Sequence, residues 1–130
     1  MNSKRSWHGL ALVALVPLLI FPVGAPASAH AQRLVSTPAV GAVLYKWPAL
    51  ASVTFDDDIV AMPDANQLVV TDPKRHRVDT GAFVVKGATL TVALKKTKLY
   101  GKYTVTYRVI SADGHPVSES YPFYFKKKKK

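Results

Sequence analysis

The chain has 130 residues, enough for one domain, and carries 18 Lys and Arg against 8 Asp and Glu, a formal net charge of +10. It has no cysteine, which excludes disulfides and thiolate metal sites. Five of its cations are the consecutive Lys126–Lys130, so much of the excess charge lies in a tail. No stripe of alternating basic and aromatic residues favours nucleic-acid binding, and we expect no nucleic-acid partner.

Residues 1–29 have the pattern of a secretory signal peptide. A basic start precedes an apolar run over 9–23, and the small residues of 27–29 precede a cleavage point. The alternative is an uncleaved membrane anchor, but a spanning helix needs about 20 apolar residues, and two prolines interrupt this shorter run. We therefore expect export, to a periplasm or out of the cell. Cleavage after Ala29 would make His30 the first residue of the mature chain.

Seven short runs of the mature chain alternate apolar and polar residues, as half-buried β-strands do. Turn residues separate these runs, and no stretch shows a convincing helical period. The expected strands are, in chain order, 32–36, 51–55, 66–71, 81–85, 88–94, 102–111 and 121–125. The sequence therefore predicts an all-β domain over 30–125, built as an immunoglobulin-like β-sandwich, followed by the basic Lys tail 126–130.

The longest run, 102–111, is predicted to lie near the middle of a sheet. Its buried face would carry Tyr103, Val105, Tyr107 and Val109, and the polar residues between them would face the other side. The preceding LYGKY at 99–103 is typical of the start of a late strand in immunoglobulin-like sandwiches, where a Tyr packs at a corner.

The stretch SADGHPVS, at 111–118, combines turn residues with two potential metal ligands. Asp113 and His115 are two positions apart and can face the same side, and Gly114 permits the bend between them. Such a turn also occurs as simple punctuation. Cleavage of the leader would add a second half-site, because an N-terminal His30 offers its α-amine and its ring nitrogen to one ion. Three nitrogens and one carboxylate oxygen in a plane suit Cu(II).

Other chemistry-bearing residues have simpler interpretations. His76 lies in PKRHR, where three cations disfavour a metal, so we expect a solvated turn. Asp56–Asp58 lack the spaced pattern of a Ca²⁺ loop and are better placed as a strand-end cluster near the copper. Trp47 is expected to pack in the core rather than relay electrons. A serine-hydrolase G-x-S-x-G motif is missing, so the sequence does not indicate hydrolase chemistry.

Over 30–125 the chain resembles the CopC family of exported copper-binding and copper-resistance proteins. The resemblance rests on AHAQRLVSTPAVGAVL at the start, VTF followed by acidic residues, GATLTVAL, GKYTVTYRVISADGHPVS and the aromatic final strand YPFYF. It implies a seven-stranded Greek-key β-sandwich. It also implies a Cu(II) site built from His30, Asp113 and His115.

Two details of the resemblance concern further ligands. Family members often have an acidic residue shortly after V-x-F near the copper; Asp57 is the best match as a minor ligand, with Asp56 beside it, although Asp replaces the usual Glu. Some members bind Cu(I) in a Met-rich segment. Met62 is the only methionine after residue 29, and thioether coordination needs more than one, so we expect no such site.

The leading hypothesis is an exported Cu(II)-binding protein, not an enzyme, that sequesters copper or exchanges it with a membrane copper transporter. One alternative is a copper-dependent oxidative enzyme with a histidine brace, although Asp113 would fill a position that oxygen chemistry needs. Another is a metal-free β-sandwich accessory module. Lys126–Lys130 is either a disordered, solubilising end or a weak contact with anionic membranes.

Overall fold

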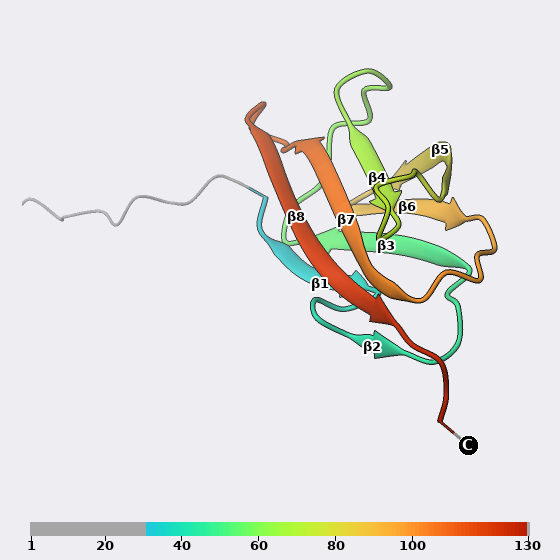
Figure 1. Cartoon of the computed structure of the whole chain (residues 1–130). Coiled ribbons are helices and arrows are strands. Elements are labelled where there is room, and N and C mark those ends of the chain that lie inside the picture. The colour runs from blue at the N-terminus through green and yellow to red at the C-terminus, as the bar shows by residue number, and fades with distance from the viewer. Residues whose placement is uncertain (1–30, 130) are drawn as a thin grey trace, which may run out of the picture.

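The computed structural model of the chain describes residues 31–129 (Figure 1). These residues form eight β-strands in two four-stranded sheets, and none of them is helical. The first sheet has the order β1 (Arg33–Thr37), β3 (Leu50–Phe55), β6 (Thr89–Leu94) and β5 (Asp79–Lys86). The second has the order β2 (Val43–Leu44), β8 (Pro116–Phe125), β7 (Gly101–Ile110) and β4 (Gln67–Thr71). Neighbouring strands are antiparallel except for β2 and β8, which are parallel.

The predicted β-sandwich is confirmed, with two differences in the strands. β2 was not expected, because it has two residues and therefore no alternation to detect. β8 begins at Pro116 instead of residue 121. Its first half is polar and exposed, which is typical of a turn, but it continues the register with β7 as far as the pair Ile110 and Pro116. The hairpin thus extends beyond the part of the strand that packs on the core.

The core lies between the two sheets, and β7 shows how the sequence places it. Tyr103, Val105, Tyr107 and Val109 are all buried, and the residues between them are at most partly buried, as predicted. β7 lies between β8 and β4, inside its sheet. The Tyr103 hydroxyl donates to the Leu99 carbonyl at 2.6 Å, so this Tyr forms the expected corner.

Trp47 packs against the core as predicted, within a cluster of aromatic rings. Its ring centroid lies 4.9 Å from that of Tyr103 and 5.3 Å from that of Phe125. Phe123 stacks on Tyr103 at 5.2 Å and also lies 6.2 Å from Trp47. Offset and edge contacts at these separations stabilise aromatic pairs beyond the area they bury. The cluster closes one end of a sandwich that has no disulfide to hold it.

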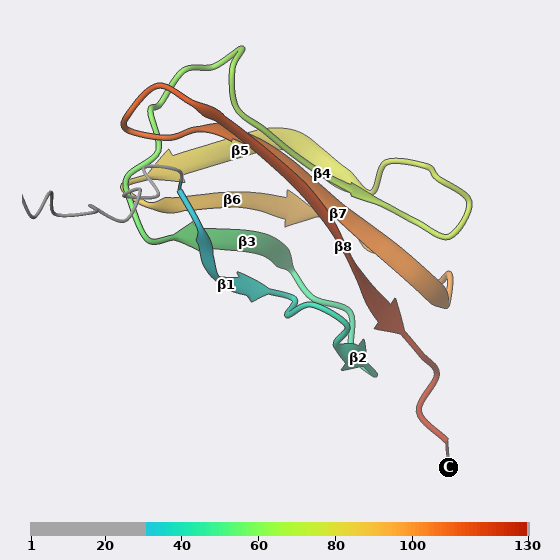
Figure 2. The same ribbon diagram turned by 90° about the vertical axis from the view of Figure 1, so that its left-hand side faces the viewer.

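The sandwich has two distinct ends, which we call the turn end and the tail end (Figure 2). At the turn end lie the start of β1, the β3–β4 loop, the β5–β6 turn and the β7–β8 turn. At the tail end lie β2, the β4–β5 loop, the β6–β7 loop and Lys126–Lys129. Residues 31–129 include no helix that is long and apolar enough to cross a membrane.

Candidate metal centre

The β7–β8 turn, Ser111–His115, is a tight, well-bonded loop at the turn end. The Ser111 N–H donates to the His115 carbonyl at 3.0 Å, and the Gly114 N–H donates to the Ser111 carbonyl at 2.8 Å. Gly114 has a φ of +88°, in the left-handed region that glycine adopts without steric cost. The turn is therefore defined by its backbone before any metal is considered.

The turn brings the two predicted ligands Asp113 and His115 together. His115 Nδ1 lies 2.9 Å from Asp113 Oδ2, and the His115 N–H donates to Asp113 Oδ1 at 3.1 Å. The Ser111 hydroxyl donates to the same Oδ1. The side chains of His115 and Asp113 are 59% and 24% exposed, so both are accessible from solvent. The pair places a nitrogen and an oxygen donor side by side at the surface.

Hydrogen bonds keep the Asp113 carboxyl ionised. The Ser111 hydroxyl and then the His115 backbone N–H lower its pKa to about 2, from an ordinary 3.8. A metal must bind the deprotonated form of a carboxylate. Asp113 is therefore ready as an anionic oxygen donor throughout the neutral and mildly acidic range.

The base of the turn is fixed to the segment that follows β3. Ile59 forms an antiparallel bridge with Ser111, which is fully buried. The Asn66 side chain accepts a bond from the Ile110 N–H at 3.0 Å and donates to the Val60 carbonyl at 2.5 Å. Sequence reasoning missed Asn66, because a single loop Asn carries no periodic signal. Its buried amide holds the end of β7 and the β3–β4 loop together.

The third predicted ligand, His30, lies outside the described residues, but the chain directly after it is held at the turn end. The Gln32 N–H donates to Asp56 Oδ1 at 2.6 Å, and the Asp56 N–H donates to the Gln32 carbonyl at 2.9 Å. Asp57, the predicted minor ligand, is exposed and accepts a bond from the next backbone N–H at 2.8 Å. Among the three acids, Asp56 is thus the one that contacts the chain beside His30.

A second contact, which we call the Arg33 clamp, joins the start of β1 to the sheet that carries the turn. Arg33 Nη2 and Nε donate to Glu119 Oε1 and Oε2 at 2.8 and 3.1 Å, and the Tyr107 hydroxyl also donates to Glu119. The guanidinium lies 5.2 Å from the centre of the Tyr121 ring. The bonds from Arg33 and, to a smaller extent, from Tyr107 lower the pKa of Glu119, whereas burial raises the pKa of Tyr107. Two-point Arg–carboxylate pairs fix orientation as well as charge.

The remaining candidates stay apart from this pair. His76 is exposed, with Nδ1 3.4 Å from an Asp72 oxygen, in agreement with the predicted solvated turn. Within residues 31–129, no three His, Cys, Asp or Glu side chains form a group that could hold a metal ion. The described part of the candidate centre therefore consists of Asp113 and His115.

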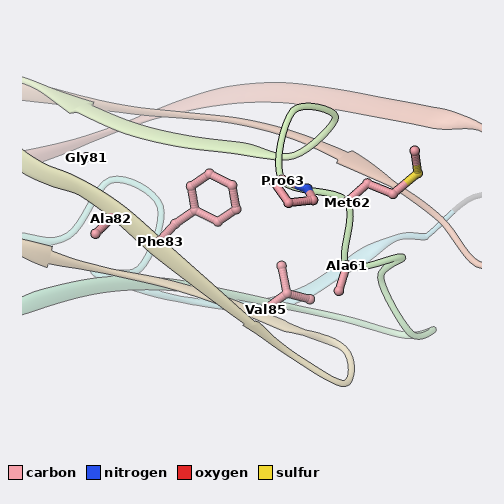
Figure 3. A pocket seen from close by; sticks show the side chains of 7 residues that line it. All are labelled: Ala61, Met62, Pro63, Gly81, Ala82, Phe83 and Val85. Carbon is pink, nitrogen blue, oxygen red and sulfur yellow. The ribbon is translucent and has the colours of Figure 1, made fainter.

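A separate apolar pocket of about 350 Å³ lies between the β3–β4 loop and β5 (Figure 3). Phe83 and Val85 of β5 lie across from Pro63, and Met62 is half exposed at its edge. The lining supplies hydrocarbon and one thioether sulfur; it consists of Ala61, Met62, Pro63, Gly81, Ala82, Phe83 and Val85. This pocket shares no residue with the Asp113–His115 pair.

Comparisons with known proteins agree with this fold. Two solved structures overlay on the chain: CopC from Methylosinus trichosporium OB3b, with a TM-score of 0.64 at 23% identity, and PcoC, a methionine-rich copper resistance protein from Escherichia coli, with 0.61 at 20%. They cover 78% and 75% of this chain and 98% and 99% of their own. At these identities the overlays establish the shared β-sandwich.

The sequence comparisons identify the family. The copper transport protein CutJ of Bacillus subtilis (strain 168) is 32% identical over 128 residues, which are 95% of this chain and 22% of that protein. The chain thus spans about a fifth of the length of this relative. The family model described as the CopC domain matches residues 34–126, which is most of the chain and all of the strands from β2 to β8. The chain belongs to the CopC domain family.

Proposed function

We propose that this protein binds Cu(II) at the turn end through His30, Asp113 and His115. The single observation that carries the proposal is the Asp113–His115 pair, held 2.9 Å apart on a bonded turn in a chain of the CopC family. Relatives and neighbours of the family are copper transport and copper resistance proteins. We infer that this chain likewise sequesters copper or passes it to a membrane copper transporter.

The donor set suits Cu(II) in type and charge. Asp113 supplies an ionised oxygen, and its Oδ2 lies 2.9 Å from His115 Nδ1, close enough for both atoms to bind one ion. His30 would supply its ring nitrogen and, once the leader is removed, its α-amine. Nitrogen and oxygen donors in a tetragonal arrangement are those that Cu(II) prefers. The proposal therefore depends on export with cleavage after Ala29, to a periplasm or outside the cell.

Two fixed points on the chain support a role for His30. Gln32, two residues later, is bonded to Asp56, and Arg33, three residues later, is bonded to Glu119. Extended chain covers about 3.3 to 3.6 Å per residue, so His30 stays within a short reach of these anchors. We propose Asp57 as a minor contributor only, because Asp56 makes the contact to the chain start.

A binding protein explains the site better than an oxidative enzyme with a histidine brace. Asp113, as an oxygen ligand, would occupy a position that an oxygen-activating copper centre keeps open. The copper ion is then cargo, and no reaction of a substrate is needed. The Lys tail, residues 126–130, contributes at most a weak attraction to anionic membranes in this proposal.

Copper titration of two chains that differ only at the N-terminus tests the proposal. One begins at His30, and the other carries six extra residues, Gly-Ser-Gly-Ser-Gly-Pro, before it. The extension moves the α-amine away from His30, and its length and proline avoid a terminal Xaa-Xaa-His sequence, in which the amine, two backbone amides and the imidazole would together chelate Cu(II). We expect the extension to weaken Cu(II) binding by about tenfold or more, since a chelating donor is lost. The readout is competition against a chromophoric chelator, with electron paramagnetic resonance to count nitrogen donors.

The other outcomes separate the alternatives. Equal affinity of the two chains would contradict the role of the His30 amine. No tight Cu(II) site in either chain would favour a metal-free accessory module. Oxidation of a chromogenic substrate by the loaded protein with peroxide, above the rate of free copper, would favour the enzyme.

A further inference from the structure

Charge is divided between the two ends of the sandwich. Of the 15 Lys and Arg residues among 31–129, 12 lie at the tail end, against two of the eight Asp and Glu residues. The turn end and the strands next to it hold the other three cations and six carboxylates. The tail-end cations are Lys46, Lys74, Arg75, Arg77, Lys95, Lys96, Lys98, Lys102 and Lys126–Lys129. The fold thus brings cations from five separate segments of the sequence together at one strongly basic end.

All 12 of these cations are exposed, and the two acids nearby do little to neutralise them. Asp79 is fully buried and is paired with Arg77 at 2.7 Å. Asp72 accepts bonds from the backbone N–H groups of Lys74 and His76 at 2.8 and 2.9 Å. Within the described chain, none of the tail-end lysines forms an ion pair. Their charges therefore face solvent together.

Aromatic rings lie among these lysines. Tyr45 and Tyr100 are 58% and 49% exposed. A hollow of about 500 Å³ is lined by Lys46, Lys96 and Lys98 beside Trp47 and Pro48, and another of about 530 Å³ by Tyr45 with Lys126–Lys129. Tyr and Trp rings interspersed with long basic side chains are typical of surfaces at the membrane–water boundary, where the rings sit at headgroup depth and the ammonium groups meet phosphates.

We propose that the tail end is a docking surface for anionic lipid headgroups. Ten of its 12 cations are lysines, which act as point charges and suit a diffuse anionic surface, whereas recognition of one shaped anion favours the two-point geometry of arginine. The β4–β5 loop, the β6–β7 loop and the C-terminal segment lie at one end of the molecule (Figure 2), and the lysines that they carry are exposed, as a flat, extended partner requires. Docking in this way holds the Asp113–His115 turn on the side away from the membrane.

This inference does not depend on copper and goes beyond a contact made by the tail alone. It includes the folded surface around Lys46, Lys96 and Lys98 and therefore fixes an orientation. Because the attraction is electrostatic, it decreases with added salt: the screening length falls from about 10 Å at 0.1 M to about 3 Å at 1 M.

Vesicle co-sedimentation of the metal-free chain from residue 30, which contains the whole sandwich, tests the proposal. We expect binding to vesicles of phosphatidylcholine with phosphatidylglycerol, no binding to phosphatidylcholine alone, and release at high salt. K96E with K98E should weaken binding by at least about 30-fold, because two cations near an anionic surface are lost and two repelled carboxylates replace them. The matched control is K86E with R108E, which makes the same charge change at exposed positions nearer the turn end and should change binding less than about threefold.

Trp47 reports the orientation, since it is the only tryptophan in the chain from residue 30. Bromine-labelled lipids should quench its fluorescence on binding. Equal losses in the two double variants would overturn the proposal, because net charge alone would then explain binding. The proposal would also be overturned if deletion of 126–130 abolished all binding while K96E with K98E had no effect, since the tail alone would then bind. Tighter binding to poly-glutamate than to the anionic vesicles would overturn it as well and would indicate an acidic protein partner. Circular dichroism confirms that each variant is folded.

Discussion

Asp113 combines a structural and a chemical task in one carboxylate. Its Oδ1 accepts bonds from the Ser111 hydroxyl and the His115 N–H, which close the turn, and its Oδ2 faces the imidazole of His115 at 2.9 Å. The same bonds lower its pKa to about 2. When the pH falls from neutral, Asp113 therefore remains ionised. Loss of metal on mild acidification would then come from protonation of nitrogen donors, which must be neutral to bind.

Replacing Asp113 with Asn separates charge from shape. The amide oxygen can still accept the bonds that close the turn, so we expect D113N to fold normally. Its Cu(II) affinity should fall by about 10- to 100-fold, because a neutral oxygen replaces an anionic one beside the imidazole. Chelator competition measures the affinity. The control is D64N, which removes one exposed carboxylate from the β3–β4 loop at the same end; an equal loss in that variant would show a general charge effect.

At the scale of elements, the β7–β8 hairpin shows which parts of the site a sequence can predict. Asp113 and His115 were predicted because they are neighbours in the chain, and their relative position depends on a local turn. The supporting contacts were not predicted. The Arg33 clamp joins Arg33 to Glu119, 86 positions later, and the Asn66 side chain contacts Ile110, 44 positions later. Only the folded sheets bring these residues together. Binding by His30 remains a prediction.

Most of the strands were predictable because alternation, like the turn, is a local property of the sequence. All seven predicted runs are strands of the sandwich, and alternation reveals a buried face most clearly in β3, β4, β6 and β7. The two segments that were missed show no alternation. β2 is too short to alternate, and the start of β8, with Ser118, Glu119 and Ser120 all exposed, has no buried face to report. Hydrogen bonding to β7, not burial, makes that segment a strand.

Gly114 offers a test of the turn as an element. Its φ of +88° is strained for any residue with a side chain, and a Cβ there would meet no atom within 4 Å. The cost of G114A is therefore conformational, about 1–2 kcal/mol in the free energy of unfolding, and the turn should relax and weaken Cu(II) binding. Urea unfolding and copper titration measure the two effects.

Gly41 supplies a matched control for that experiment. It has a φ of +71° and also has open space where a Cβ would lie, but it precedes β2 at the tail end. G41A should therefore cost similar stability and leave Cu(II) affinity unchanged. If G41A weakened copper binding as much as G114A, the loss would follow from lower stability and not from the geometry of the turn.

For the whole molecule, the central problem is how two sheets stay together without a disulfide. The buried faces of β3, β6 and β7 supply most of the attraction, through residues such as Val53, Leu90 and Tyr107. The Arg33 clamp adds a polar link across the sandwich, from β1 in one sheet to β8 in the other. It lies at the turn end, so the same contact that joins the sheets also holds the chain near His30.

The clamp predicts a specific dependence of stability on pH. Arg33 lowers the pKa of Glu119 from its ordinary 4.5, so the folded state holds this carboxylate ionised at pH values where the unfolded chain begins to protonate it. Its contribution is complete above pH 4.5 and is lost as the pH falls through the lowered folded-state value. E119Q should therefore reduce the free energy of unfolding at neutral pH by about 1 kcal/mol, a modest amount because Glu119 is partly exposed and screened. The difference from the wild type should vanish in strong acid. Urea unfolding across the acid range measures the difference, and D64N controls for the loss of one exposed carboxylate from the same end of the molecule. A gap between E119Q and wild type that persists in strong acid would mean that Glu119 contributes packing and not charge.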